Sequence, residues 1–328
     1  MIQTPRVTAT RVLDEAIVHP GLHPSIGENI QGPSLIRVPD WVQAPLGRYY
    51  LYFADHKGAY IRLAYADDVT GPWRVHAPGT LHLAGSGFPT EAPAYTEADA
   101  EAVRARLASV GMRFPHDPVL DMTIPHIASP DVHVDNDQRR IRMYFHGLER
   151  FGEQVTRVAL SADGLAFNAL PEVHGPSYFR VVEIGAAYIA MAMPGRFYRS
   201  DDPLSGFVPG PQLFGPMQRH AALCLRGDLL YVFYTDVGDA PERIRVAAID
   251  TRAPFAEWTA SAPSDVLAPE RVWEGADQPN APSLRSVAPG RVNQLRDPAV
   301  FVEDDGCWLL YAVAGESGIG LARLTFRD

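Results

Sequence analysis

The sequence predicts an all-β fold, a five-bladed β-propeller with one helical insertion. Three observations carry this prediction. Glycine (27 residues) and proline (29 residues) are spread along the 328-residue chain and divide it into short segments rather than long helices. Those segments are rich in aromatic and β-branched residues, as strands are. One unit also recurs about five times: a polar start, a strand, an aromatic strand, a polar turn and a third strand.

The repeats place five blades in a single domain, residues 1–328. The blades are expected at residues 29–76, 126–170, 175–210, 218–258 and 293–326. A polar phrase opens each blade, such as Gln31-Gly32-Pro33-Ser34 in the first, and an aromatic strand such as Tyr49-Tyr50-Leu51-Tyr52-Phe53 follows. Units of ~40 to 50 residues that each form a small meander are typical of propeller blades.

Two insertions interrupt the repeat, at residues 77–124 and 259–292. The first contains one helix from Glu97 to Leu107, with Thr96 as its N-cap and acidic residues in its first turn. The helix is expected either to pack Val103 and Leu107 on the propeller or to cover a site. The second insertion is rich in Pro, Ala and Ser and is expected to be a long loop.

Charge and composition exclude several classes of protein. The formal net charge of -10, without a Lys/Arg run, argues against nucleic acid as a partner. No apolar run is long enough to cross a membrane, and the first residues lack a signal-peptide pattern, so a cytoplasmic protein is expected. Cys224 and Cys307 each lie in an apolar strand and are expected to be buried free thiols. The oligomeric state is not indicated.

Polar residues collect at two places in every blade. Strand direction alternates in a meander, so the start of the innermost strand and the turn between the second and third strands lie on the same face of the disc. Polar residues at one axial mouth exceed what turns need, which predicts a site there. The candidate substrate-binding residues are Asn29, Gln31, His56, His126, Tyr178, Arg180, Arg219, His220 and Arg296, and the candidate catalytic residues are Asp131, Asp297 and Glu316.

Each candidate also has a structural interpretation. Pro130 holds the chain extended before Asp131, which places this carboxylate at the start of a strand, where it could equally accept backbone N–H bonds in a turn. His126 could bond only backbone, His56 could be a solvated turn residue, and Asp297 could cap a turn. An arginine at a strand start, such as Arg180, needs an acceptor or open water.

Several phrases resemble a known enzyme family. Ala128-Ser129-Pro130-Asp131-Val132-His133 and Arg296-Asp297-Pro298-Ala299-Val300 are similar to blade openings of the five-bladed propeller glycoside hydrolases, of which family 43 is best known. The closing phrase Asp67-Asp68-Val69-Thr70-Gly71-Pro72-Trp73 is also similar. The resemblance implies an Asp base in the first blade, an orienting Asp in the second and a Glu acid in the third. Only the second carries over, as Asp131; the first blade opens with Gln31-Gly32-Pro33-Ser34 and the third with Tyr178-Phe179-Arg180.

These observations favour a glycoside hydrolase that acts on a glycan or oligosaccharide by carboxylate acid/base catalysis. The arginines favour an acidic or modified sugar. Two alternatives stay open: a carbohydrate-binding propeller without catalysis, and a uronate-directed lyase that uses histidine and arginine. The histidines at positions 56, 126, 133, 146 and 220 do not have the spacing of a zinc protease, so no metal or other cofactor is expected.

Overall fold

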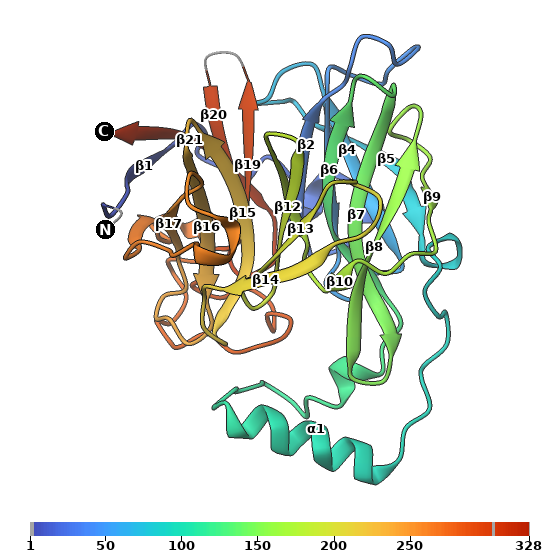
Figure 1. The fold of residues 1–328 in the computed structure, drawn as a ribbon, viewed down its shortest axis with the longest axis vertical. Helices are drawn as coiled ribbons and strands as arrows, with labels where there is room; N and C mark the ends of the chain where they lie inside the picture. The colour runs from blue at the N-terminus through green and yellow to red at the C-terminus, as the bar shows by residue number, and fades with distance from the viewer. Residues whose placement is uncertain (1–2, 304–305, 328) are drawn as a thin grey trace.

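Five antiparallel sheets surround a common axis in the computed structural model, which confirms the predicted five-bladed propeller with one helix (Figure 1). The structure describes residues 3–303 and 306–327; residues 1, 2, 304, 305 and 328 of the expected domain lie outside the described residues. The innermost strands contact one another around the axis. No helix in the described ranges is long and apolar enough to cross a membrane.

Each blade is a meander whose first strand lies at the axis. The first blade contains β2 (Gln31–Arg37), β3 (Tyr49–Ala54), β4 (Tyr60–Ala66) and β5 (Arg74–His82). The second contains β6 (Ile127–Asp135), β7 (Arg140–Arg150), β8 (Glu153–Ser161) and the short β9 (Asn168–Ala169) and β10 (Gly175–Pro176). The third contains β11 (Arg180–Ile184), β12 (Ala187–Ala192), β13 (Arg196–Ser200) and β14 (Val208–Gln212). The fourth contains β15 (Gln218–Arg226), β16 (Leu229–Asp236), β17 (Ile244–Asp250) and β18 (Ser264–Leu267). The fifth contains β19 (Arg296–Glu303), β20 (Gly306–Ala312), β21 (Ile319–Arg327) and β1 (Arg6–Arg11).

The apolar core is divided among the contacts between blades. One cluster of buried side chains fills each of the five spaces between neighbouring blades. Tyr52 and Phe145 share the cluster between the first two blades, and Tyr144 and Phe179 share the next. Second strands have adjacent blades on both faces, which is why every residue of β3 is buried. Cys224 and Cys307 are buried and free, as expected.

The fifth blade is closed by the beginning of the chain. The repeat places the first blade from residue 29 and does not indicate the earlier strand β1, which pairs antiparallel with β21, with Val7 opposite Phe326 (Figure 1). A local repeat cannot reveal this pairing because the two strands are at opposite ends of the sequence. The outer strands of two other blades also extend into the expected insertions, β5 to His82 and β18 from Ser264 to Leu267.

We expect the β1 closure to be important for stability. Val7 is buried in the cluster between the last two blades, whereas Thr8 on the other face of the strand is exposed. Val7→Asp places an unpaired carboxylate in this cluster and should lower the free energy of unfolding by about 3 kcal/mol or more. Thr8→Asp should change it by less than about 0.5 kcal/mol. Urea unfolding of both variants tests this, and equal effects would contradict it.

The helix forms as predicted. Helix α1 (Glu97–Ser109) begins at Thr96, whose hydroxyl accepts from the amide of Asp99 while the Asp99 carboxylate accepts from the amide of Thr96. The rings of Tyr95 and Phe151 are stacked with centroids 4.5 Å apart, which joins the start of the helix to the tip of the β7–β8 hairpin (Figure 1). The helix therefore lies beside the propeller, at the end to which this hairpin points.

The short turns of 3-10 helix lie in the connections. They are Pro20–Leu22, Pro24–Ile26, Leu83–Gly85, Leu120–Met122, Phe255–Glu257 and Val272–Glu274. Two of these turns lie in the first thirty residues, between β1 and the first blade, and Val272–Glu274 lies in the second insertion.

Candidate functional site

The start of each inner strand carries one residue with a left-handed backbone. These residues are Gly32 (φ 63°), Ser129 (φ 51°), Tyr178 (φ 66°), His220 (φ 36°) and Asp297 (φ 44°). In four of the five blades a β-bulge interrupts the pairing with the second strand at this place. Bulges redirect side chains, and strained backbone concentrates at functional sites. These five residues therefore occupy equivalent positions around the propeller axis. The end of the axis at which they lie is called here the axial mouth.

Four rings form a row along the axial mouth. Adjacent ring centroids are 5.9 Å apart for His126 and His146, 4.3 Å for His146 and Tyr178, and 4.9 Å for Tyr178 and His220. Burial, assisted by nearby cationic groups, lowers the pKa of His126 to about 3 and lowers the pKa values of His146 and His220 well below their usual range. The three imidazoles are therefore neutral near pH 7 and can both donate and accept hydrogen bonds.

Several buried polar atoms at the axial mouth lack a hydrogen-bond partner. They include Nε2 of Gln31, Nε2 of His126, Nδ1 of His146, Oγ of Ser286 and both carboxyl oxygens of Asp297. Buried polar groups in folded proteins are nearly always bonded, to protein or to water. A concentration of unpaired groups around one axis indicates a place built to bind a polar ligand.

Asp297 is fully buried at this mouth. Its Oδ1 atom lies 3.0 Å from Nδ1 of His220, although the angle does not make a hydrogen bond. Burial and the negative charge of Glu316 raise the pKa of Asp297 to about 8, against the opposing effect of Arg180 and other arginines. This carboxyl group is therefore protonated at neutral pH.

Glu316 is the ionised counterpart of Asp297. It accepts hydrogen bonds from Asn29 Nδ2 at 2.7 Å and from Arg296 Nη1 at 2.7 Å, and its Oε1 atom lies 3.2 Å from His56 Nδ1. Burial opposes ionisation, but the charges of His56 and Arg296 outweigh it and hold the pKa of Glu316 well below its usual range. Two adjacent carboxyl groups with opposite pKa shifts are the arrangement by which acid and base roles are separated.

The carboxylate of Glu316 belongs to a buried ion network. Glu242, which is fully buried, accepts from Arg219 Nε at 3.0 Å and from Arg219 Nη2 at 2.5 Å, and lies 3.8 Å from Arg296 Nε. Arg296 in turn donates to Gln294 and to Glu316. The chain Arg219, Glu242, Arg296, Glu316 fixes the Glu316 carboxylate in place.

Three arginines expected to bind a sugar therefore have protein partners instead. Arg219 and Arg296 belong to the buried ion network, and Arg180 donates to the backbone carbonyls of Ser129, Pro130 and Ala221. Asn29 and His56 both hold Glu316. Four of the expected binding residues remain at the mouth. Gln31, His126 and His220 have polar atoms without a hydrogen-bond partner, and the ring of Tyr178 lies beside that of His220.

Asp131 does not join the other two predicted catalytic carboxylates. It lies beyond the Ser129 bulge, where it accepts from His133 Nε2 and from the Val181 amide, both at 2.8 Å. It lines a separate pocket of about 260 Å³ toward the far ends of the inner strands, which includes Arg37 and Val302. The reason is the extra residue of the bulge: Ser129, not Asp131, occupies the place that Asp297 occupies in the fifth blade.

The axial mouth opens into a pocket of about 460 Å³, called here the axial pocket. His56, Tyr178 and His220 line it from the propeller. Both insertions cover it: Leu107 of α1 lines one wall, and the amide of Arg285 from the second insertion donates to the Arg113 carbonyl at 2.8 Å. The helix therefore shows features of both interpretations: Val103 is buried beside the β7–β8 hairpin, and Leu107 lines the pocket.

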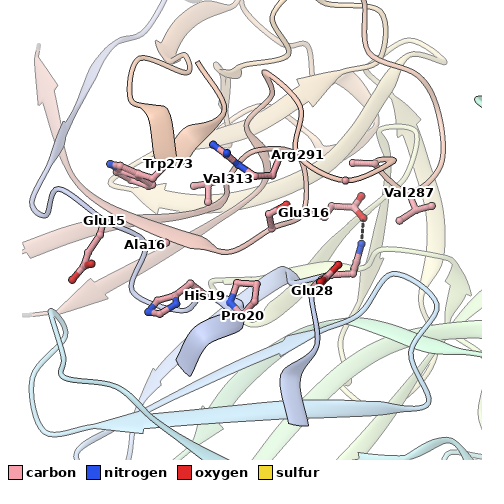
Figure 2. Close-up of a pocket in the computed structure, with 14 residues that line it drawn as sticks. Glu15, Ala16, His19, Pro20, Glu28, Trp273, Val287, Arg291, Val313 and Glu316 are labelled. Atoms are coloured by element: carbon pink, nitrogen blue, oxygen red, sulfur yellow. Dashed lines mark hydrogen bonds between the residues drawn. The ribbon is translucent and has the colours of Figure 1, made fainter. Parts of the chain in front are cut away.

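A larger pocket of about 740 Å³ lies on the other side of Glu316 (Figure 2). Its walls come from the segment before the first blade, with Glu15 and Glu28, and from the second insertion, with Trp273 and Arg291. Figure 2 shows Glu316 at its inner wall, bonded to the amide of Asn29. We place the functional site in the axial pocket, because two residues with unpaired polar atoms, His220 and Ser286, line it.

Sequence reasoning missed several residues of the site. The site also contains His146, which lies within β7, and Lys57, which lies in the turn between β3 and β4; neither is among the candidate binding residues. Glu242 lies in the turn between β16 and β17, whereas Arg285 and Ser286 come from the second insertion, which carries no periodic signal. Among residues 3–303 and 306–327, no group of three or more His, Cys, Asp or Glu side chains could hold a metal ion.

Comparison with known proteins establishes the family. The chain is 34% identical over 323 residues to Uncharacterized protein R118 of Acanthamoeba polyphaga mimivirus, which covers 90% of this chain and 83% of that protein. The chain belongs to the family of this mimiviral protein. No family model matches it.

Solved structures similar to this member of the mimiviral protein's family are glycoside hydrolases of family 43. They include a thermostable family-43 glycoside hydrolase (14% identity, 92% of this chain and 91% of that chain, TM-score 0.55). A second is the GH43_1 enzyme from Xanthomonas citri complexed with xylotriose (13%, 95% and 89%, TM-score 0.56). A third is CoXyl43, a β-xylosidase/α-arabinofuranosidase from a compost microbial metagenome (12%, 97% and 95%, TM-score 0.57). These likenesses confirm the expected resemblance in fold.

Proposed function

We propose that this protein is a glycoside hydrolase whose reaction takes place in the axial pocket, with Asp297 as the proton donor. The observation that carries the proposal is the pairing of a buried, protonated carboxyl group with an adjacent ionised one, at the axis of a propeller of the family 43 type. Glycosidases need one carboxylic acid that protonates the leaving oxygen and one carboxylate.

The two carboxyl groups have different roles in this proposal. Asp297 holds its proton up to about pH 8 and donates it to the oxygen of the bond that breaks. Glu316 stays ionised and stabilises the positive charge that develops on the sugar ring in the transition state. Water then attacks the anomeric carbon and returns a proton to the Asp297 carboxylate. Tyr178 and the neutral imidazoles beside it offer ring faces and polar atoms to the sugar.

A uronate-directed lyase is the second candidate, and one observation favours it. Lys57 lines the axial pocket near the row of rings, and burial lowers the pKa of Lys57 to about 8. A lysine that is neutral in part near pH 8 can abstract a proton, and a lyase must remove the proton beside the carboxylate of a uronate.

Product analysis separates the candidates. We expect the protein, incubated with a panel of aryl glycosides and oligosaccharides, to release reducing sugar without an ultraviolet-absorbing unsaturated product. An unsaturated product would identify a lyase instead. Saturable binding of the same sugars without any product would identify a binding propeller.

The pH profile of hydrolysis is a further prediction. Because the protonated form of Asp297 is the active one, kcat should be maintained below the pKa of about 8 and should fall as the pH rises through it. Initial rates measured from pH 5 to pH 10 test this. A rate that rises through pH 8 would contradict the assignment of Asp297 as the acid.

A further inference from the structure

Arg285 is a partly buried cation for which the described residues provide no carboxylate partner within ion-pair distance. Its Nε atom lies 3.2 Å from the sulfur of Met112, its Nη1 atom lies 3.1 Å from the sulfur of Met193, and its Nη2 atom donates to the Pro216 carbonyl at 2.9 Å. Thioether sulfurs are weak acceptors that carry no charge. Glu242 acts on Arg285 from farther away, but its carboxylate is bonded to Arg219.

Most other buried arginines of this propeller pair directly with a carboxylate, whereas Arg180 donates to three backbone carbonyls. Arg219 pairs with Glu242, Arg296 with Glu316, Arg142 with Asp135 and Arg157 with Glu149, at distances of 2.5 to 2.9 Å. Leaving a buried charge unpaired costs free energy, so such charges are normally paired. Burial and the neighbouring Arg219 lower the pKa of Arg285 to about 10, so it still carries its charge at neutral pH. The charge of Arg285 therefore does not stabilise the fold through an ion pair.

Lys57 repeats the pattern in the same pocket. Its Nζ atom donates to the backbone carbonyl of Asp121 at 3.2 Å, while one oxygen of the Asp121 carboxylate lies 3.1 Å from His116 Nε2. Charged residues that line the axial pocket are Lys57, Arg106, Arg219 and Arg285, against the single carboxylate of Asp121. This positive lining stands out in a chain with a net charge of -10.

Unpaired polar atoms are present beside these cations. Ser286, next to Arg285 in sequence, is 4% exposed, and its hydroxyl has no partner; His220 is 3% exposed with an unpaired Nδ1 atom. Both residues line the axial pocket. A pocket of about 460 Å³ is in the size range of small-molecule sites. The pocket thus combines space, unbonded polar groups and two cations that lack a counter-charge.

We propose that the axial pocket binds a sugar that carries an anionic group, a carboxylate or a phosphate, and that Arg285 and Lys57 neutralise this group. The proposal deepens the proposed function, on which it rests for the sugar, by naming the substrate class. The charge of the ligand completes the ion pairs that the protein leaves open, and charge-assisted bonds of this kind are stronger than neutral ones.

Binding measurements test the anionic group without requiring turnover. The probes are D-glucuronate, D-glucose 6-phosphate and D-glucose, each titrated into the full chain by calorimetry. We expect at least one anionic sugar to bind about tenfold more tightly than D-glucose, and the comparison between the two distinguishes carboxylate from phosphate. Inorganic phosphate that competes with either one supports a site for the anionic group itself. If neither anionic sugar binds more tightly than D-glucose, the proposal is wrong.

Two substitutions at Arg285 separate charge from packing. Arg285→Met removes the charge and keeps an apolar chain against Met112 and Met193; it should abolish the preference for anionic sugars and raise the melting temperature, because an unpaired, partly buried charge is removed. Arg285→Lys should retain most of the preference. If Arg285→Met keeps the preference, or melts below wild type, the proposal is overturned. Hydrolysis of neutral glycosides without a preference for anionic sugars would overturn this inference and leave the proposed function intact. Binding of anionic sugars without hydrolysis would support this inference and overturn the proposed function.

Discussion

Asp297→Asn is expected to lower kcat by a factor of ~10² to 10⁴ while it stabilises the fold at neutral pH. A general acid contributes about this factor to a rate, and asparagine cannot donate the proton to the leaving oxygen. Asparagine has nearly the same shape, so the contact with His220 is kept. Steady-state kinetics on a substrate found by product analysis measure the loss, and an undiminished kcat would remove Asp297 from the mechanism.

The expected gain in stability follows from the direction of the pKa shift. Burial raises the pKa of Asp297 from 3.8 to about 8, so between these values the native state holds a proton that the unfolded state has released. The wild-type protein therefore loses stability as the pH rises from about 4 to about 8. Asparagine does not titrate, so Asp297→Asn should remove this slope and raise the free energy of unfolding at pH 7 by up to a few kcal/mol.

Asp131→Asn provides the contrasting control. Asp131 has a lowered pKa, because His133 and Arg180 outweigh the effect of burial, and its carboxylate accepts from the Val181 amide. Removing this charge should lower the free energy of unfolding and should cost less turnover than Asp297→Asn. Urea unfolding at pH 7 should show a higher free energy of unfolding for Asp297→Asn and a lower one for Asp131→Asn. The same sign for both variants would contradict this account of the pair.

The repeat in the sequence predicted the fold because each blade carries its own pattern. Polar phrases before apolar strands located the inner strands, including the one at whose start Asp297 lies, and the turns after second strands pointed to Glu316. The pattern did not predict contacts between residues that are far apart in the sequence. Strand β1 pairs with β21 at the other end of the chain, and Arg285 reaches the site from a loop without periodicity.

The bulges explain why Asp131 and Asp297 lie at different places along the axis. Both residues adjoin a proline in similar phrases, Ser129-Pro130-Asp131 and Arg296-Asp297-Pro298. Asp297 precedes its proline and occupies the left-handed position at the mouth, whereas Asp131 follows its proline and lies within the strand. A difference of two positions relative to the bulge moves a side chain along the axis, from the mouth where Asp297 lies to the pocket that Asp131 lines.

Glu242→Gln is expected to cause the largest loss of stability among the changes at the site. The substitution removes the charge that Arg219 and Arg296 share in the buried ion network and leaves excess positive charge there. Breaking a buried ion pair by removal of one partner costs about 3 to 5 kcal/mol. Glu270→Gln is the matched control, because Glu270 pairs with Arg11 at 2.8 Å with its side chain 66% exposed, and it should cost less than about 1 kcal/mol.

The pH dependence of this loss gives a second test of the same network. Arg219 and Arg296 outweigh burial and lower the pKa of Glu242, so its contribution to stability is present above the unfolded value near 4.5 and is lost as the pH falls through the lower folded value. The difference between wild type and Glu242→Gln should therefore be full at pH 7 and shrink progressively below about pH 4.5. Urea unfolding at pH 7 and at pH 4 measures it. A loss no greater than that of Glu270→Gln at pH 7 would show that the network does not hold Arg219 and Arg296 through charge, and the position of Glu316 would then need another support.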